Sequence, residues 1–212
     1  MKTIVVAGEK GGVGKSTVTV LTADWLAYQG QSVKITDADV NETTRKWVDY
    51  CAELGRSVSS HQGDYHLIDT AGRTGSGVSF LRKADLILAP FQPLTADVDR
   101  LIDWFLMTNA RIQRCVAFIP NRLRAAGLTI EQQQGLVQVQ KLIESEGAGH
   151  LLPGLIERLA VYPPLLGGSA ENFFAVSEPD PRKARSLVKA QAECDQLFRE
   201  ALALLTEEKV HA

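Results

Sequence analysis

The sequence has few of the features that mark secreted, zinc-binding or membrane proteins. Its 212 residues include three cysteines, at positions 51, 115 and 194. This spacing fits neither a disulfide framework nor a zinc site, so we expect buried thiols in a reducing compartment. The longest apolar runs are too short for a signal peptide or a membrane span. We therefore expect a soluble, cytoplasmic protein.

The chain also lacks an excess of charge of either sign. Lys and Arg together number 23 and Asp and Glu 25, which gives a net charge of −2. This balance excludes a wholly basic nucleic-acid-binding coat but leaves room for a local basic patch. Although only 7% of residues are aromatic, 45% are hydrophobic, which excludes disorder along the whole chain. With no repeat and no linker, we expect a single domain over residues 1–212.

Short apolar segments alternate with segments of helical spacing. Strands are predicted at residues 3–7, 32–36, 65–68, 86–90, 116–119 and 155–159. Helices are predicted at residues 16–29, 45–54, 97–109, 129–146 and 182–205. Apolar strands that alternate with helices favour a parallel sheet covered on both faces. The predicted fold is therefore α/β and doubly wound.

A glycine-rich loop joins the first predicted strand to the first predicted helix. It reads Lys10-Gly11-Gly12-Val13-Gly14-Lys15-Ser16-Thr17. Its backbone N–H groups and the helix N-terminus attract phosphate, Lys15 is placed to reach the β- and γ-phosphates, and the Ser16 hydroxyl is placed to bind Mg²⁺. The standard loop has a glycine where this chain has Glu9, and Lys10 adds a second cation that needs a polyphosphate to neutralise it. The strand and helix on either side disfavour the alternative, a glycine turn with incidental lysines.

Carboxylates stand where the next two predicted strands end. Asp37 and Asp39 follow the second strand, and Asp69 follows the third. Ligands of open α/β sheets bind at the carboxyl ends of the strands. Carboxylates beside phosphates suit metal coordination and the orientation of an attacking water, so we predict Ser16, Asp37 and Asp69 as the magnesium site. The alternatives are a solvated strand end for the pair and a helix cap for Asp69.

The loop from Lys10 to Ser16 resembles the deviant Walker A loop of the ParA and MinD ATPases, a branch of the P-loop NTPases. The resemblance extends over most of the chain, because the later motifs follow in the family's order. It implies a P-loop NTPase fold, ATP and Mg²⁺ as ligands, and a homodimer that encloses two nucleotides. In that dimer Lys10 would reach the phosphates bound by the partner subunit.

The same resemblance implies the residues of hydrolysis. Asp37-Ala38-Asp39 resembles the Walker A-prime motif, whose second aspartate positions the hydrolytic water. We therefore expect Lys10, Lys15 and Asp39 to be catalytic. The family usually continues with Pro-Gln, whereas this chain has Val40-Asn41.

Later segments resemble the family's base-binding and dimer regions. Asn121 matches an asparagine that hydrogen-bonds adenine, and Pro163 is similar in position to residues that pack on the base. Without the resemblance, Asn121 would be read as a turn residue. Residues 91–97 resemble a segment near the dimer face, although Asp97 equally suits a helix N-cap. Residues 72–77, which include Arg73, are expected to form a switch loop that senses the γ-phosphate.

Four cations open the last predicted helix, namely Arg182, Lys183, Arg185 and Lys189. Such a cluster is usually a solvated face, but two copies in a dimer are enough for nonspecific DNA binding. The resemblance implies an ATP-bound dimer on nucleoid DNA and a ParB-like or cargo-adaptor partner that stimulates hydrolysis. The cargo would be a plasmid, a chromosome region or a protein assembly. The chain starts at its first strand, as short ParA proteins without an N-terminal helix-turn-helix domain do.

Three alternatives remain open. A MinD-like protein would bind membrane, but the chain's last residues lack a basic amphipathic character. A small-molecule ATP-dependent ligase on the same scaffold would need a substrate pocket but no second lysine in the loop. A nonenzymatic nucleotide switch would have no use for Asp39. The four histidines are scattered and show no metal-ligand spacing.

Overall fold

The computed structural model describes residues 1–39, 41–56, 58, 63–71, 77–168 and 171–207. The described part excludes Val40 and the chain's last five residues. It also excludes residues 72–76 of the predicted switch loop, and of that loop it includes only Gly77. All three cysteines are buried thiols outside any disulfide, as predicted. No described helix is both long enough and apolar enough to cross a membrane.

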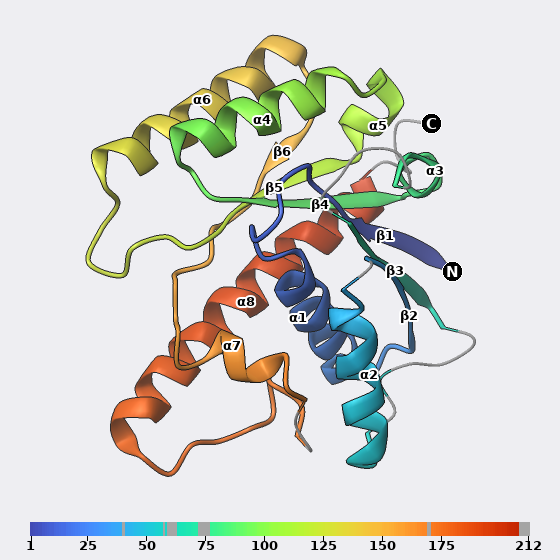
Figure 1. Cartoon of the computed structure of the whole chain (residues 1–212), viewed down its shortest axis with the longest axis vertical. Helices are drawn as coiled ribbons and strands as arrows, with labels where there is room; N and C mark the ends of the chain where they lie inside the picture. The colour runs from blue at the N-terminus through green and yellow to red at the C-terminus, as the bar shows by residue number, and fades with distance from the viewer. Residues whose placement is uncertain (40, 57, 59–62, 72–76, 169–170, 208–212) are drawn as a thin grey trace.

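The described strands form one parallel sheet (Figure 1). They are β1 (Lys2–Val6), β2 (Val33–Ala38), β3 (Tyr65–Thr70), β4 (Leu86–Phe91), β5 (Val116–Pro120) and β6 (His150–Leu151), in the spatial order β2-β3-β1-β4-β5-β6. On one side of β1 lie β3 and then β2. On its other side lie β4, β5 and β6. The carboxyl end of β1 therefore lies at the point where the strand order reverses, which is where such sheets bind ligands.

Helices cover both faces of the sheet (Figure 1). On one face lie α1 (Lys15–Tyr28), α2 (Thr43–Glu53), α7 (Tyr162–Leu165) and α8 (Pro181–Glu207). On the other lie α3 (Val78–Leu81), α4 (Thr95–Leu106), α5 (Ala110–Arg114) and α6 (Ile130–Glu146). The predicted doubly wound α/β fold is thereby confirmed.

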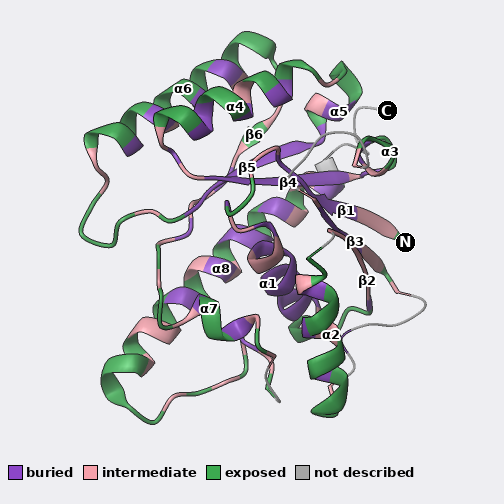
Figure 2. Cartoon of the chain, in the orientation of Figure 1, coloured by how far each residue is buried: buried purple, intermediate pink, exposed green. Residues whose placement is uncertain are grey.

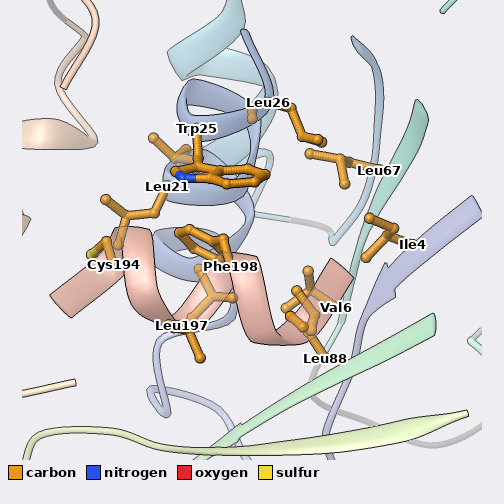
Figure 3. Close-up of a cluster of buried hydrophobic side chains, with 14 of the residues drawn as sticks. Ile4, Val6, Leu21, Trp25, Leu26, Leu67, Leu88, Cys194, Leu197 and Phe198 are labelled. Atoms are coloured by element: carbon orange, nitrogen blue, oxygen red, sulfur yellow. The ribbon is translucent and has the colours of Figure 1, made fainter. Parts of the chain in front are cut away.

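The larger core packs α1 and α8 against the sheet. Figure 3 shows Trp25 of α1 beside Phe198 of α8, with Ile4 and Leu67 reaching toward them from the strands. The two aromatic ring centroids lie 6.1 Å apart. The strands in the centre of the sheet are buried on both sides (Figure 2), which explains why their sequences are apolar rather than alternating.

One predicted strand is wrong. Residues 155–159 contribute only an isolated bridge between Leu123 and Ile156, and the sixth strand is the short β6 at His150–Leu151. The N–H of Leu152 still donates to the carbonyl of Phe118, but the next N–H to reach β5 is that of Leu155, on the carbonyl of Pro120. This spacing of three residues breaks the regular register after Leu152. The chain then continues beside the loop that follows β5, where the N–H of Glu157 donates to the carbonyl of Leu123.

Candidate nucleotide site

The glycine-rich loop connects β1 to α1 at the reversal point of the sheet. Gly12 and Gly14 have φ values of 78° and 100°, which favour glycine, and Gly14 is the N-cap of α1. The Lys15 ammonium folds back over the loop and donates to the carbonyl of Lys10 at 2.8 Å. Burial lowers the pKa of Lys15, while the charges of Asp69 and Asp39 oppose that shift. The loop therefore places a buried cation beside the N-terminus of α1, whose backbone N–H groups suit a phosphate.

The end of β5 closes against the same loop. The Asn121 amide nitrogen donates to the carbonyl of Val13 at 2.7 Å, and its Oδ1 accepts from the N–H of Arg122. A Cβ atom on Gly14 would lie 2.3 Å from that amide nitrogen. Asn121 is thus built into the loop, and its second amide hydrogen is left to reach a ligand.

Two strand ends bring carboxylates to the loop. The register of β2 and β3 pairs Asp37 with Asp69. Asp69 is 1% exposed; its Oδ2 accepts from the Thr44 hydroxyl, while its Oδ1 has no hydrogen-bond partner among the described residues. Burial raises the pKa of Asp69 to about 6, against the lowering effect of the Thr44 and Ser16 hydroxyls. A buried carboxylate oxygen without a partner, beside a hydroxyl, fits a hard cation such as Mg²⁺.

Asp39 has a different environment. Its Oδ1 accepts from the backbone N–H of Asn41 at 2.9 Å and from the Asn41 side-chain amide at 3.0 Å. Asn41, one of the two residues that depart from the family pattern, therefore orients this carboxylate. Asp37 accepts from the N–H groups of Asp39 and Arg45, so the loop after β2 is fixed at both of its ends.

Lys10 turns away from the phosphate loop. Its ammonium donates to Asp97 of α4 in an ion pair in which the lysine side chain is 39% and the carboxylate 3% exposed. The second oxygen of Asp97 is buried without a partner in the described part of the chain. The N-cap of α4 is Leu94, so the alternative reading of Asp97 as an N-cap is wrong. Asp97 instead forms an ion pair with the Lys10 side chain, which extends away from the phosphate loop.

A cavity of about 350 Å³ lies between the phosphate loop and α7. Its lining includes Gly14, Thr17, Asn121 and Pro163, so the two residues expected to contact the base lie in one pocket with the phosphate loop. The volume falls within the usual range for small-ligand sites. The pocket is therefore suitable in position and size for the base and ribose of a nucleotide.

Sequence reasoning missed several residues of this site, among them four that are polar. Arg122, Glu157 and Arg158 line the cavity, and Thr44 binds Asp69. Arg122 has a φ of 56°, and the half-buried Arg158 is ion-paired with Glu193 of α8. Arg122 could have been predicted from its position directly after Asn121. Glu157, Arg158 and Thr44 reach the site only through the folding of the chain.

The four cations at the start of α8 are all exposed but lie on two sides of the helix. Arg182, Arg185 and Lys189 are exposed, and their spacing places them on one side of the helix. Lys183 borders a different cavity of about 440 Å³ that also contacts Phe173 and Leu187. Three cations of the cluster thus share a solvent-facing side.

Fold and site together define a P-loop nucleotide-binding protein. The sequence model of the CobQ/CobB/MinD/ParA nucleotide binding domain matches residues 4–160, so the chain belongs to that family. ParA of Rhizobium radiobacter is 29% identical over 114 residues, which are 46% of this chain and 51% of that protein. The match thus spans about half the length of the curated relative.

Solved structures share the fold. The pNOB8 ParA structure has a TM-score of 0.67 with 14% identity, covering 98% of this chain and 99% of that one. MinD in the MinC:MinD complex of Aquifex aeolicus has a TM-score of 0.66 with 16% identity, covering 94% and 95%. Apo McdA of Cyanothece has a TM-score of 0.65 with 17% identity, covering 92% and 99%.

Proposed function

We propose that this chain is a ParA-type ATPase, a single domain that binds Mg-ATP, dimerises around two nucleotides and hydrolyses ATP slowly. The observation that carries the proposal is the contrast between two lysines of one phosphate loop. Lys15 is buried over the loop, whereas Lys10 points out of it and is held by Asp97. A loop that needed one cation for its own phosphates would not retain a second one directed elsewhere.

In this proposal the phosphates lie on the N–H groups of Gly11 to Ser16, with Lys15 on the β- and γ-phosphates. Ser16, Asp37 and Asp69 hold Mg²⁺ directly or through water, and the metal draws charge from the transferred phosphoryl group. Thr17 and Asn121 border the base and ribose pocket, and Pro163 packs on the base.

Hydrolysis requires an oriented water and a positive charge that compensates the negative charge of the transition state. Asp39 is the residue proposed to orient the water, because Asn41 fixes its Oδ1 and leaves Oδ2 free of any described partner. Lys10, once released from Asp97, would reach the γ-phosphate held by the partner subunit. Charge stabilisation from a residue supplied in trans accelerates phosphoryl transfer in other NTPases.

The biological role proposed is positioning. The ATP-bound dimer would hold nonspecific nucleoid DNA through two copies of the face formed by Arg182, Arg185 and Lys189. A ParB-like or cargo-adaptor protein would stimulate hydrolysis and release the dimer. Plasmid DNA, a chromosome region or a protein assembly would each serve as cargo.

The test is sizing and DNA binding by the purified chain with ADP, with ATP-Mg²⁺, and with ATP-Mg²⁺ on Lys10→Ala. We expect a dimer that holds duplex DNA of unrelated sequence with ATP-Mg²⁺ only, and a monomer with Lys10→Ala. Lys141→Ala, an exposed lysine of α6 remote from the loop, is the matched control. A monomer that ignores DNA in every state would instead favour a small-molecule enzyme on the same scaffold.

A further inference from the structure

Four cations gather at the edge of the sheet opposite the phosphate loop. Arg82 and Lys83 lie between α3 and β4, while Arg111 and Arg114 lie on α5, which precedes β5. Because β4 and β5 are paired neighbours, these segments lie side by side, and the Arg111 guanidinium donates to the carbonyl of Arg82. Figure 1 shows α3 and α5 at the same end of the sheet as the N-terminus, away from the loop that enters α1.

All four cations are exposed, and none takes part in an ion pair within the described residues. Of the nearby carboxylates, Asp85 is engaged by Lys2 at 3.8 Å and by the N–H of Thr3 at 2.7 Å. Asp103, one turn before Met107, is exposed, and its carboxylate has no hydrogen-bond or ion-pair partner among the described residues. The edge therefore carries a local positive charge on a chain whose net charge is −2.

Two large apolar side chains adjoin these cations. Leu106 ends α4 and is 50% exposed, and Met107 follows it at 82%. Residues 106–111, which join the end of α4 to α5, are exposed except for the half-buried Thr108, so the apolar pair and the cations of α5 share one exposed stretch of chain (Figure 2). Exposed methionine and leucine are adaptable contacts for an apolar partner surface.

We propose that this surface, which we call the α5 edge, binds an acidic amphipathic segment of a partner protein. The α5 edge consists of Arg82, Lys83, Leu106, Met107, Arg111 and Arg114. Leucine or methionine side chains of the segment would cover Leu106 and Met107, and flanking carboxylates would pair with the four cations. Duplex DNA fits less well, since a phosphate backbone gains nothing from two exposed apolar side chains.

The location gives the proposal a distinctive property. The phosphate loop and Lys10 lie at the carboxyl ends of the strands, whereas the α5 edge lies at their amino ends. A partner bound there is not displaced when nucleotide binds or when a second copy covers the phosphate loop. Binding at the α5 edge is therefore independent of nucleotide, unlike the DNA binding proposed above, and it does not depend on that function.

The probe is a synthetic 18-residue peptide with a leucine stripe flanked by glutamates, titrated by fluorescence anisotropy into the full chain without nucleotide, with ADP and with ATP-Mg²⁺. We expect equal affinity in the three states and progressive loss of binding as salt rises. Arg111→Glu/Arg114→Glu should weaken binding by at least tenfold, and Leu106→Ser/Met107→Ser by severalfold. Arg82→Glu/Lys83→Glu gives a second charge reversal if the first variant loses its cooperative melting transition.

The matched control is Arg182→Glu/Arg185→Glu, a double charge reversal on α8, which should leave peptide binding unchanged. A peptide with serine in place of leucine tests the apolar contribution and should bind severalfold more weakly. The proposal is overturned if the α8 control weakens peptide binding equally, or if ATP abolishes binding. It is also overturned if a 24-base-pair duplex binds through the same four cations while Leu106→Ser/Met107→Ser has no effect.

Discussion

Asp69 is a carboxyl group that the fold buries at the candidate metal position. Its pKa in the folded chain is about 6, above its ordinary value of 3.8, so the folded state holds the proton more tightly than the unfolded state. Ionisation of Asp69 therefore costs stability as pH rises from about 4 to 6, by about 3 kcal/mol in full. In the absence of metal and nucleotide, Asp69→Asn should be more stable than the wild type by about 2–3 kcal/mol at pH 7.5.

The gain from Asp69→Asn should disappear near pH 4, where both forms are neutral at this position. Urea unfolding in EDTA from pH 4 to 8 measures it, with the exposed Asp99→Asn of α4 as the control. The same variant should lose Mg²⁺-dependent ATP binding, because the amide cannot replace the carboxylate. A variant that is less stable at pH 7.5, or a gain that does not vary with pH, would contradict the assignment of this cost to the carboxyl group.

The ion pair between Asp97 and Lys10 bears on the proposed dimerisation. While its carboxylate holds Lys10, the lysine is unavailable to a partner subunit, so the ion pair competes with the proposed dimer. Asp97→Asn should therefore strengthen ATP-dependent dimerisation severalfold, measured by sedimentation at a series of protein concentrations. Asp103→Asn, on the exposed side of the same helix, should have no effect. Weaker dimerisation by Asp97→Asn would show that Asp97 assists Lys10 rather than restraining it.

Sequence reasoning predicted where several candidate residues lie in the fold, but not their side-chain partners. The loop lysines, Asp37 and Asp69 lie where the strand ends predict them, because parallel strands end at one edge. The contact between Lys10 and Asp97 joins residues 87 positions apart, and that between Thr44 and Asp69 joins residues 25 apart. Neither pairing is encoded in local spacing, so only the folded chain reveals them.

At the scale of elements, the phosphate loop and the end of β5 form one unit. Gly14 has a φ of 100°, and a Cβ atom added at this position would lie 2.3 Å from the Asn121 amide nitrogen. Gly14→Ala should cost about 2–3 kcal/mol of unfolding free energy, from the left-handed backbone and the displaced amide. It should also weaken nucleotide binding, because Asn121 leaves the base pocket.

The matched control for Gly14→Ala is Gly11→Ala, in the same loop, where a Cβ has nothing within 4 Å and no positive φ is required. It should change the unfolding free energy by less than about 0.5 kcal/mol. The double variant Gly14→Ala/Asn121→Ala should recover part of the loss, because it removes the collision but not the backbone strain. Equal effects of the two glycine substitutions would rule out the contact with Asn121 as the cause.

Elements with strong periodicity were predictable, whereas those that depend on tertiary pairing were not. The sequence predicted α6 because Thr129 begins an apolar spacing, and in the structure Thr129 and Gln132 cap each other. It placed the last strand at residues 155–159, yet the ladder with β5 lies at β6, because that pairing depends on a partner strand and not on local spacing. Short α3, α5 and α7 have too few residues for a periodic signal.

At the scale of the whole molecule, a chain with a net charge of −2 can bind DNA only if it concentrates cations on one face. In the proposed dimer, Arg182→Ala/Arg185→Ala removes up to four phosphate contacts, two from each subunit. The slope of log affinity against log salt should then fall in magnitude by up to about 3.6, since each contact contributes about 0.9. The measurement is made with ATP-Mg²⁺ on an Asp39→Ala background, in which the proposed loss of hydrolysis keeps the dimer assembled.

Arg199→Ala is the control that distinguishes loss of a DNA-binding face from loss of any positive charge on α8. Arg199 lies on the same helix but is ion-paired with Asp195 at 2.8 Å, so its charge is already compensated. Its removal should leave the salt slope unchanged. If Arg182→Ala/Arg185→Ala also leaves the slope unchanged while the ATP-bound dimer still holds DNA, the DNA lies on another face. The four exposed cations of the α5 edge would then be the next to test, by Arg111→Glu/Arg114→Glu in the same salt titration.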